Sequence, residues 1–197
     1  MMRIALLGDL HYPDVGSNNE ELSVAVDHFF GQYLREFFSV EADFHVSIGD
    51  LTHLGLESEF VNVYNYIKQY NINFRAVLGN HDVLSLPKEK ISSLIQQSTY
   101  DLIETQGSLL LFLDTTKEFE LHGWGLDQKQ WQWLEKQIDR SKEKPLFICP
   151  SSCSRNNRFF YSWCRFSIVP RHSPIVEKKK WTSIIFQWTY PCAILHS

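Results

Sequence analysis

The sequence lacks an apolar run long enough to cross a membrane, and it lacks a secretory signal at its start. A membrane span needs about 20 consecutive apolar residues, and none is present although 44% of the residues are hydrophobic. The opening residues, MMRIALLGDL, lead directly into a predicted strand without the basic segment and small-residue cleavage site of a signal peptide. We therefore expect a globular, cytoplasmic protein with no membrane partner.

Glycine and cysteine are each missing from one part of the chain. All nine glycines precede residue 148, and all four cysteines follow it. Residues 1–148 contain 12 basic and 22 acidic residues, a net charge of −10, whereas residues 149–197 contain 7 and 1, a net charge of +6. A segment without Gly or Asp has few of the residues that form turns. We predict an incomplete α/β domain at residues 1–148 and an aberrant, poorly ordered tail at residues 149–197.

These absences also exclude classes of binding protein. The acidic first region has no patch that could neutralise nucleic-acid phosphates, which is the main source of non-specific nucleic-acid binding. The cysteines lack the C-x-x-C pairs of structural zinc sites. The basic run EKKKW at 177–181 is too short to identify a nucleic-acid site, since such runs are usually solvated.

The first region alternates short apolar segments with segments of helical periodicity. Apolar residues recur every three or four positions in the predicted helices, and they form short runs in the predicted strands. Strands are predicted at 3–8, 43–50, 74–80, 108–115 and from Pro145, and helices at 20–39, 57–70 and 125–140. This alternation predicts an α/β fold built on a layered sheet.

Polar motifs follow the first three predicted strands. They are GDLHY with Asp9 and His11, GDLTH with Asp50, and GNHD with Asn80, His81 and Asp82. In an α/β sheet the carboxyl ends of neighbouring strands lie together, and ligands collect there. Carboxylate, imidazole and amide oxygen are suitable ligands for a divalent metal ion. The sequence therefore predicts a metal site assembled from three separate loops.

Each motif suggests a role for its side chains. Asp9 and His11 are two residues apart, so on an extended backbone they face the same way and can bind one ion. Asp50 has two oxygens with which to bridge two ions, and Asn80 offers a neutral oxygen to the second ion. His81 is available to donate a proton. We interpret His45 as a packed core residue, and we do not include His53 among the site residues.

Together the three motifs resemble those of the calcineurin-like metallophosphoesterase superfamily, whose signature begins with D-x-H, G-D and G-N-H-D or G-N-H-E. The resemblance covers about residues 3–148. It implies an α/β/β/α sandwich that hydrolyses phosphate mono- or diesters at a dinuclear centre of manganese, iron or zinc. By this resemblance one ion is bound by Asp9, His11 and Asp50, and the other by Asp50 and Asn80.

The resemblance also implies catalytic roles. His81 assists the leaving oxygen and Asp82 orients His81, while the two ions clamp the phosphate and activate the attacking water. The substrate itself is not predicted, because loops and caps that vary freely select it in this superfamily.

The resemblance is incomplete after the fifth predicted strand. The superfamily continues with His-His or His-His-Pro and then Gly-His-x-His, and neither motif is present. Read one base later, the codons of residues 149–153 permit Ala-His-His-Pro, and those of residues 187–192 permit Asn-Gly-His-Ile-His-Ala. We interpret the tail as out of frame after a single-base frameshift near codons 144–149. On this interpretation the chain is truncated in its catalytic half and impaired in activity.

Two other functions are compatible with the sequence. The chain could be a non-catalytic α/β module whose polar strand ends bind a partner or a nucleotide. It could also be the inactive product of a pseudogene.

Overall fold

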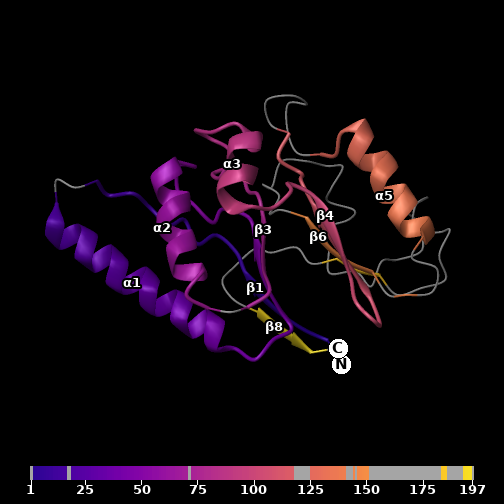
Figure 1. The fold of residues 1–197 in the computed structure, drawn as a ribbon, viewed down its shortest axis with the longest axis horizontal. Helices are drawn as coiled ribbons and strands as arrows, with labels where there is room; N and C mark the ends of the chain where they lie inside the picture. Colours follow the sequence, from indigo (N-terminus) through magenta and orange to yellow (C-terminus); the bar gives the residue numbers. More distant parts are fainter. Residues whose placement is uncertain are drawn as a thin grey trace. The chain divides into compact units, whose positions relative to one another are not determined.

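The computed structural model describes residues 2–16, 19–70, 72–117, 125–140, 144, 146–150, 183–185 and 193–196. The chain forms two compact units, Met1–Gln97 with Tyr190–Ser197, and Ser98–Thr189 (Figure 1). Strands and helices alternate along most of the chain, which confirms the predicted α/β class. No helix in these ranges combines the length and the apolar character needed to cross a membrane.

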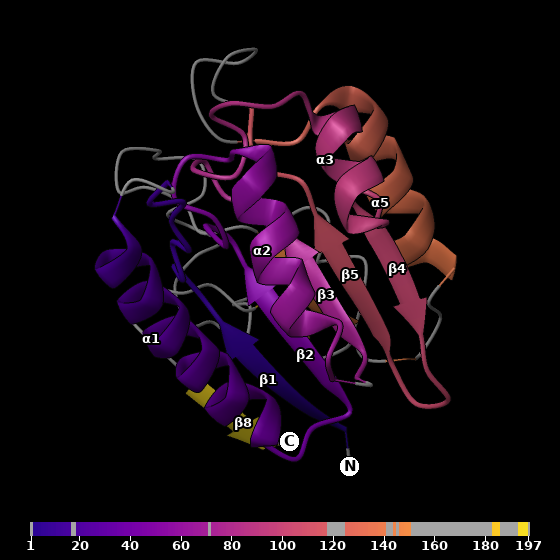
Figure 2. The ribbon, with the colours of Figure 1, turned by 60° about the vertical axis from the view of Figure 1, so that its left-hand side comes forward.

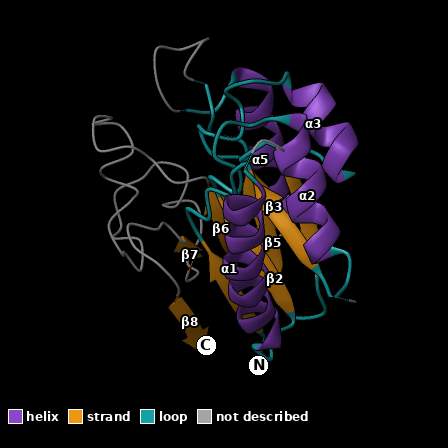
Figure 3. Cartoon of the chain, turned by 90° about the vertical axis from the view of Figure 1, so that its left-hand side faces the viewer, coloured by secondary structure: helices purple, strands orange, loops and turns teal. Residues whose placement is uncertain are grey.

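The first unit is built on a four-stranded sheet with the order β3-β2-β1-β8. Strands β1 (Arg3–Leu7), β2 (Phe44–Ile48) and β3 (Phe74–Val77) are parallel, and β8 (Ala193–His196) runs antiparallel to β1. Helices α1 (Glu20–Ser39) and α2 (Glu57–Ile67) make the crossovers and cover one face of the parallel strands (Figure 2). Figure 3 shows α1 in front of the strands of its sheet. These crossovers place the carboxyl ends of β1, β2 and β3 side by side.

Helix α1 begins at a capped end and is buried mainly in its second half. The Asn19 side chain accepts a hydrogen bond from the Leu22 amide at 3.0 Å, which satisfies an amide that has no partner within the helix. The buried residues of α1 are Leu34, Phe37 and Phe38. Its earlier apolar positions are more open, and Phe29 is 61% exposed. The apolar stripe in the sequence is therefore longer than the part of the helix that packs on the sheet.

The second unit has the strand order β4-β5-β6-β7. Strand β4 (Asp101–Glu104) is antiparallel to β5 (Leu109–Leu113), whereas β6 (Leu146–Pro150) and β7 (Ser183–Ile185) extend the sheet in parallel. Helix α5 (Gln128–Arg140) buries Leu134 and Ile138 in the core formed with β5 and β6. The buried Gln130 holds the end of β5, since its side chain makes hydrogen bonds of 2.9 and 2.8 Å to the Asp114 backbone.

The predicted strands and helices of the first region are all present, with ends that differ by a few residues. Among the described residues, four elements were not predicted: α3 (Lys88–Ile95), β4, β7 and β8. Helix α3 is short and buries only Ile91 and Ile95, so its periodicity is brief. Strand β4 has four residues, none of them fully buried, and therefore shows no clear alternation.

The prediction of a poorly ordered tail falls mostly on residues 151–182, 186–192 and 197, which lie outside the described residues. Within the tail, β7, β8 and the end of β6 are described. The domain boundary at residue 148 and the frameshift therefore stay predictions. Of the four cysteines, only Cys149 is among the described residues; it is buried and free, and burial raises the pKa of its thiol to about 12.

Candidate metal centre

The loops that follow β1 and β2 are joined by backbone hydrogen bonds. The Asp9 amide donates to the Gly49 carbonyl at 3.2 Å, and the His11 amide donates to the Asp50 carbonyl at 2.9 Å. The parallel pairing of the two strands is thus continued into their loops, and it aligns the D-x-H and G-D motifs.

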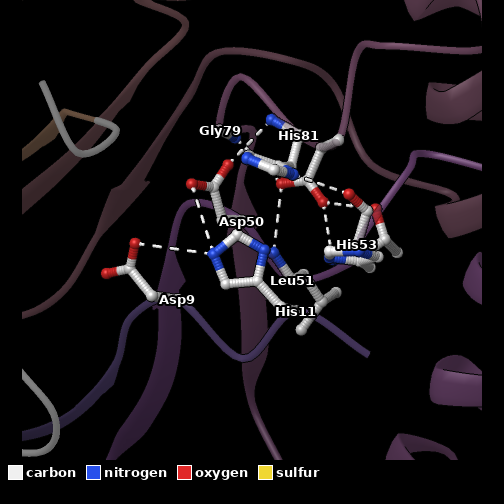
Figure 4. Close-up of polar contacts among 9 residues, drawn as sticks. Asp9, His11, Asp50, Leu51, His53, Gly79 and His81 are labelled. Atoms are coloured by element: carbon white, nitrogen blue, oxygen red, sulfur yellow. Dashed lines mark hydrogen bonds and ion pairs between the residues drawn. The ribbon is translucent and has the colours of Figure 1, made fainter. Parts of the chain in front are cut away.

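This alignment brings three predicted ligands together. His11 Nε2 lies 4.0 Å from Asp9 Oδ1 and 3.9 Å from Asp50 Oδ2 (Figure 4). One ligand atom from each of the three residues falls within 4.8 Å of the others. An ion bound at 2.0–2.2 Å separates its ligand atoms by roughly 3–4 Å, so small side-chain movements would complete a site. The two carboxylates and one imidazole also suit a divalent ion chemically.

The same three residues have an unusual backbone. Asp9, His11 and Asp50 have φ angles of 52°, 49° and 51°, in the left-handed region that residues other than glycine seldom occupy. Such a conformation costs about 1–3 kcal/mol per residue and is concentrated at functional sites. The tight turns that aim these side chains at one point are therefore obtained at the expense of stability.

Burial also affects His11. It lowers the pKa of the His11 imidazole, and the neighbouring His81 lowers it further, while Asp9 opposes this effect. His11 Nδ1 is buried and makes no hydrogen bond within the described part of the chain. Both observations suit a neutral imidazole with a lone pair available to an ion.

Asp82 ties the loop after β3 to the loop after β2. Its carboxylate is fully buried and accepts hydrogen bonds from the amides of Leu51 at 3.2 Å, Thr52 at 2.8 Å and Gly79 at 2.9 Å. The Thr52 hydroxyl donates a fourth at 2.7 Å. Burial raises the pKa of Asp82 to about 6, and these hydrogen bonds counteract part of the rise.

His81 is held by two contacts. Its amide donates to Asp50 Oδ1 at 2.9 Å, and its Nδ1 lies 2.6 Å from the His53 carbonyl oxygen. A carbonyl only accepts, so Nδ1 carries the proton and the lone pair of the neutral ring is on Nε2. The motif predicts that Asp82 orients His81. In the structure the ring contacts the His53 carbonyl, while Asp82 binds the amides of the two loops.

Asn80 lies between two residues with fixed amides. The Gly79 amide donates to Asp82 and the His81 amide donates to Asp50, so the backbone on either side of the half-buried Asn80 is anchored. Its position at the carboxyl end of β3 is the one that the motif predicts.

Sequence reasoning missed two residues of this region. The His53 imidazole lies beside those of His11 and His81, with ring centroids 5.8 Å from each. Glu59 is 1% exposed, and its carboxylate accepts hydrogen bonds from the Leu54 amide at 2.9 Å and the Leu56 amide at 3.1 Å. His53 follows Asp50 by three residues, which was a usable signal, whereas nothing in the sequence distinguished Glu59 from other acidic residues at the start of a helix.

A model of the calcineurin-like phosphoesterase family matches residues 2–181, which include all three motifs. The chain belongs to this family. Among curated proteins, none matches the sequence. Membership of the calcineurin-like phosphoesterase family confirms the resemblance inferred from the motifs.

A solved structure shows the same fold. A dimetal phosphatase from Danio rerio is 13% identical, with a TM-score of 0.54; the match covers 76% of this chain and 69% of that one. The purple acid phosphatase PPD1 from yellow lupin (Lupinus luteus) seeds is 15% identical, with a TM-score of 0.45; the match covers 75% of this chain and 29% of that one. The first likeness places this calcineurin-like phosphoesterase chain in an α/β fold shared with a phosphatase.

Proposed function

We propose that this protein is a metal-dependent phosphoesterase that hydrolyses phosphate mono- or diesters at a dinuclear centre. The observation that carries the proposal is the convergence of Asp9, His11 and Asp50, from two loops, with ligand atoms within 4.8 Å of one another. Their left-handed backbones support it, because backbone strain of this kind is concentrated at functional sites.

The ligands divide between two ions. Asp9, His11 and Asp50 would hold the first, and Asp50 with Asn80 would hold the second. Divalent ions held by these residues, with manganese, iron or zinc as candidates, would supply Lewis-acid polarisation of the phosphoryl oxygens and would neutralise the charge that develops there.

We assign His81 to the leaving group. The contact of its Nδ1 with the His53 carbonyl fixes the ring, and when the ring also carries a proton on Nε2 it can donate that proton to a leaving oxygen in the site. Asp82 supports this role as a positioning residue, because its four hydrogen bonds hold the loop of His81 against the loop of Asp50.

We further propose that the activity of this chain is impaired. The two later histidine motifs are missing, so the first ion retains three protein ligands and the second retains two. Sequencing genomic DNA across codons 140–195 tests the frameshift explanation. Codons that spell the two histidine motifs one base out of frame would support it. An in-frame tail without such codons would contradict it and would favour a natural half-site.

Thermal unfolding in the presence of manganese tests whether the proposed ligands bind a metal ion. Mn²⁺ should raise the melting temperature of the full chain, and Asp50→Ala should abolish this effect, because Asp50 contributes to both ions. Asp139→Ala is a matched control on the exposed face of α5, and it should respond like the wild type. Hydrolysis of p-nitrophenyl phosphate and bis-p-nitrophenyl phosphate then reports monoesterase and diesterase activity. A manganese effect that persists in Asp50→Ala would contradict the assignment.

One observation favours the second candidate, a non-catalytic binding module. A cavity of about 440 Å³ lies between α1, α2 and the loop after β1. The Tyr12 hydroxyl donates to the Asp27 carboxylate at 3.2 Å in its lining, which also includes Asn62 and Asn65. Stabilisation by AMP in the presence of a chelator, without esterase activity in manganese, would favour this candidate.

A further inference from the structure

A second group of possible metal ligands overlaps the first. His11, His53 and His81 each offer a ring nitrogen within 4.8 Å of the other two. The rings of His11 and His81 are 4.5 Å apart between centroids and nearly perpendicular, and those of His53 and His81 are 5.8 Å apart. The three side chains come from the three loops at the strand ends, so the fold itself brings them together.

The loop that carries His53 is anchored by hydrogen bonds and by close packing. The His53 amide donates to the Tyr12 carbonyl at 3.0 Å, and the Ser85 hydroxyl donates to the Leu54 carbonyl at 2.6 Å. Gly55 has a φ of +68°, and a β-carbon added there would lie 2.6 Å from the Asp82 carbonyl oxygen. The position of His53 is therefore set by the fold rather than by a flexible surface loop.

The contacts of His81 prepare it for a metal. Histidine ligands usually donate their other ring N–H to a carbonyl or carboxylate, which fixes the tautomer and orients the ring. The Nδ1 of His81 makes this contact with the His53 carbonyl at 2.6 Å. Its Nε2 then has the lone pair that a metal requires.

We propose that His11, His53 and His81 form a second, imidazole-rich metal position that selects zinc over manganese. Three imidazoles suit Zn²⁺, whereas the carboxylates of Asp9 and Asp50 suit the harder Mn²⁺. A neutral imidazole has one lone pair, so His11 serves only one of the two groups at a time. Zinc at the imidazole group therefore competes with the ion held by Asp9, His11 and Asp50.

This arrangement gives zinc an inhibitory role, a consequence that rests on the proposed function. Zinc at the imidazole group occupies Nε2 of His81, the atom assigned to proton donation. It also removes His11 from the carboxylate group. Zinc at concentrations that fill this position would then reduce the manganese-dependent hydrolysis of the ester.

The test measures binding of each metal alone to the full chain after removal of metals with a chelator. Zn²⁺ affinity is measured by competition with a chromophoric chelator, and Mn²⁺ affinity from the electron paramagnetic resonance signal of the free ion. His53→Gln removes a ligand from the imidazole group only and keeps the backbone carbonyl that holds His81. Asp9→Asn removes a ligand from the carboxylate group only. His11→Gln removes the shared ligand.

We expect opposite effects from the two selective variants. His53→Gln should weaken Zn²⁺ binding by about tenfold or more and leave Mn²⁺ binding within about twofold, while Asp9→Asn should do the reverse. His11→Gln should weaken both. Zn²⁺ binding that is unchanged in His53→Gln, or equal losses for both metals in that variant, would overturn the inference.

The results that would contradict the proposed function differ from those that would overturn this inference. A chain that shows the His53-dependent zinc affinity but hydrolyses neither ester in manganese would support the inference and contradict the proposed function. A chain that hydrolyses an ester but binds zinc independently of His53 would support the function and overturn the inference.

Discussion

Gly79 approaches the carboxylate of Asp50 so closely that a β-carbon on Gly79 would lie 2.1 Å from Asp50 Oδ1 and 2.2 Å from the Asp50 amide nitrogen. The third motif thus requires a glycine because the second motif passes against it. This contact means that the backbone of one loop helps to position Asp50, a predicted metal ligand in another loop.

Gly79→Ala should therefore displace Asp50. We expect a loss of about 1–3 kcal/mol in the free energy of unfolding, as for other overpacked sites, and a Mn²⁺ affinity at least about tenfold weaker. Urea unfolding and manganese titration measure the two effects. Gly107→Ala is the control, since nothing lies within 4 Å of its added β-carbon. Manganese affinity equal to that of the wild type in Gly79→Ala would contradict the packing argument.

The left-handed backbone at Asp9 predicts a difference between two substitutions that both remove the carboxylate. Asp9→Gly should be more stable than Asp9→Ala by about 1 kcal/mol, because only glycine adopts a positive φ without a steric cost. Both variants should lose the same manganese affinity. Urea unfolding of the two metal-free proteins checks the difference, and equal midpoints would show that the φ of Asp9 carries no strain.

Asp82→Asn should loosen the junction of the two loops. Each carboxylate oxygen accepts two hydrogen bonds, so an amide NH₂ in place of either oxygen would face at least one backbone N–H donor. We expect a loss of about 1–3 kcal/mol at pH 7, with faster hydrogen exchange at the amides of Leu51, Thr52 and Gly79. Asp139→Asn, at an exposed position, is the control. Unchanged exchange at those amides would contradict the role of Asp82 as a positioning residue.

The buried His45 predicts a pH dependence of stability. His45 is 2% exposed, and burial lowers the pKa of its imidazole, while contact of its Nε2 with the Val40 carbonyl at 3.1 Å opposes the shift. A lowered pKa means that the unfolded chain binds the proton more readily than the folded chain. Stability is therefore retained above the unfolded pKa of about 6.5 and is lost as the pH falls below it.

His45→Phe should remove this contribution. The pH slope of the unfolding free energy below about pH 6.5 should become smaller by up to about 1.4 kcal/mol per pH unit, the limit for one proton. Urea unfolding of wild type and variant between pH 5 and pH 8 gives the two slopes, and their difference isolates His45 from other groups such as Asp82. Equal pH slopes for the wild type and the variant would show that the pKa of His45 is the same in the folded and unfolded states.

The sequence predicted most of the scaffold of the first unit, because its signals are local. The helical periodicity of residues 20–39 and the apolar runs that end in glycine depend on near neighbours along the chain. Strand β4 and helix α3 were missed because both are short, and strand β8 because its pairing partner, β1, is about 190 residues away.

The sequence predicted which residues of the candidate site lie together. It did not predict the contacts that hold each of them in place. The order of the motifs was enough to predict that Asp9, His11 and Asp50 lie together. The contact between His53 and His81 joins two loops through a backbone carbonyl, for which a sequence has no residue-specific signal. The assignment of the orienting role to Asp82 rested on adjacency along the chain, whereas the structure turns its carboxylate toward the amides of the two loops.

The positive φ angles of Asp9, His11 and Asp50 also bear on natural selection. Glycine would occupy each of these positions at a lower energetic cost, so folding alone does not account for an aspartate or a histidine there. Substitution by glycine would relieve the backbone at any of the three, so stability and the proposed metal binding place opposite demands on the same positions.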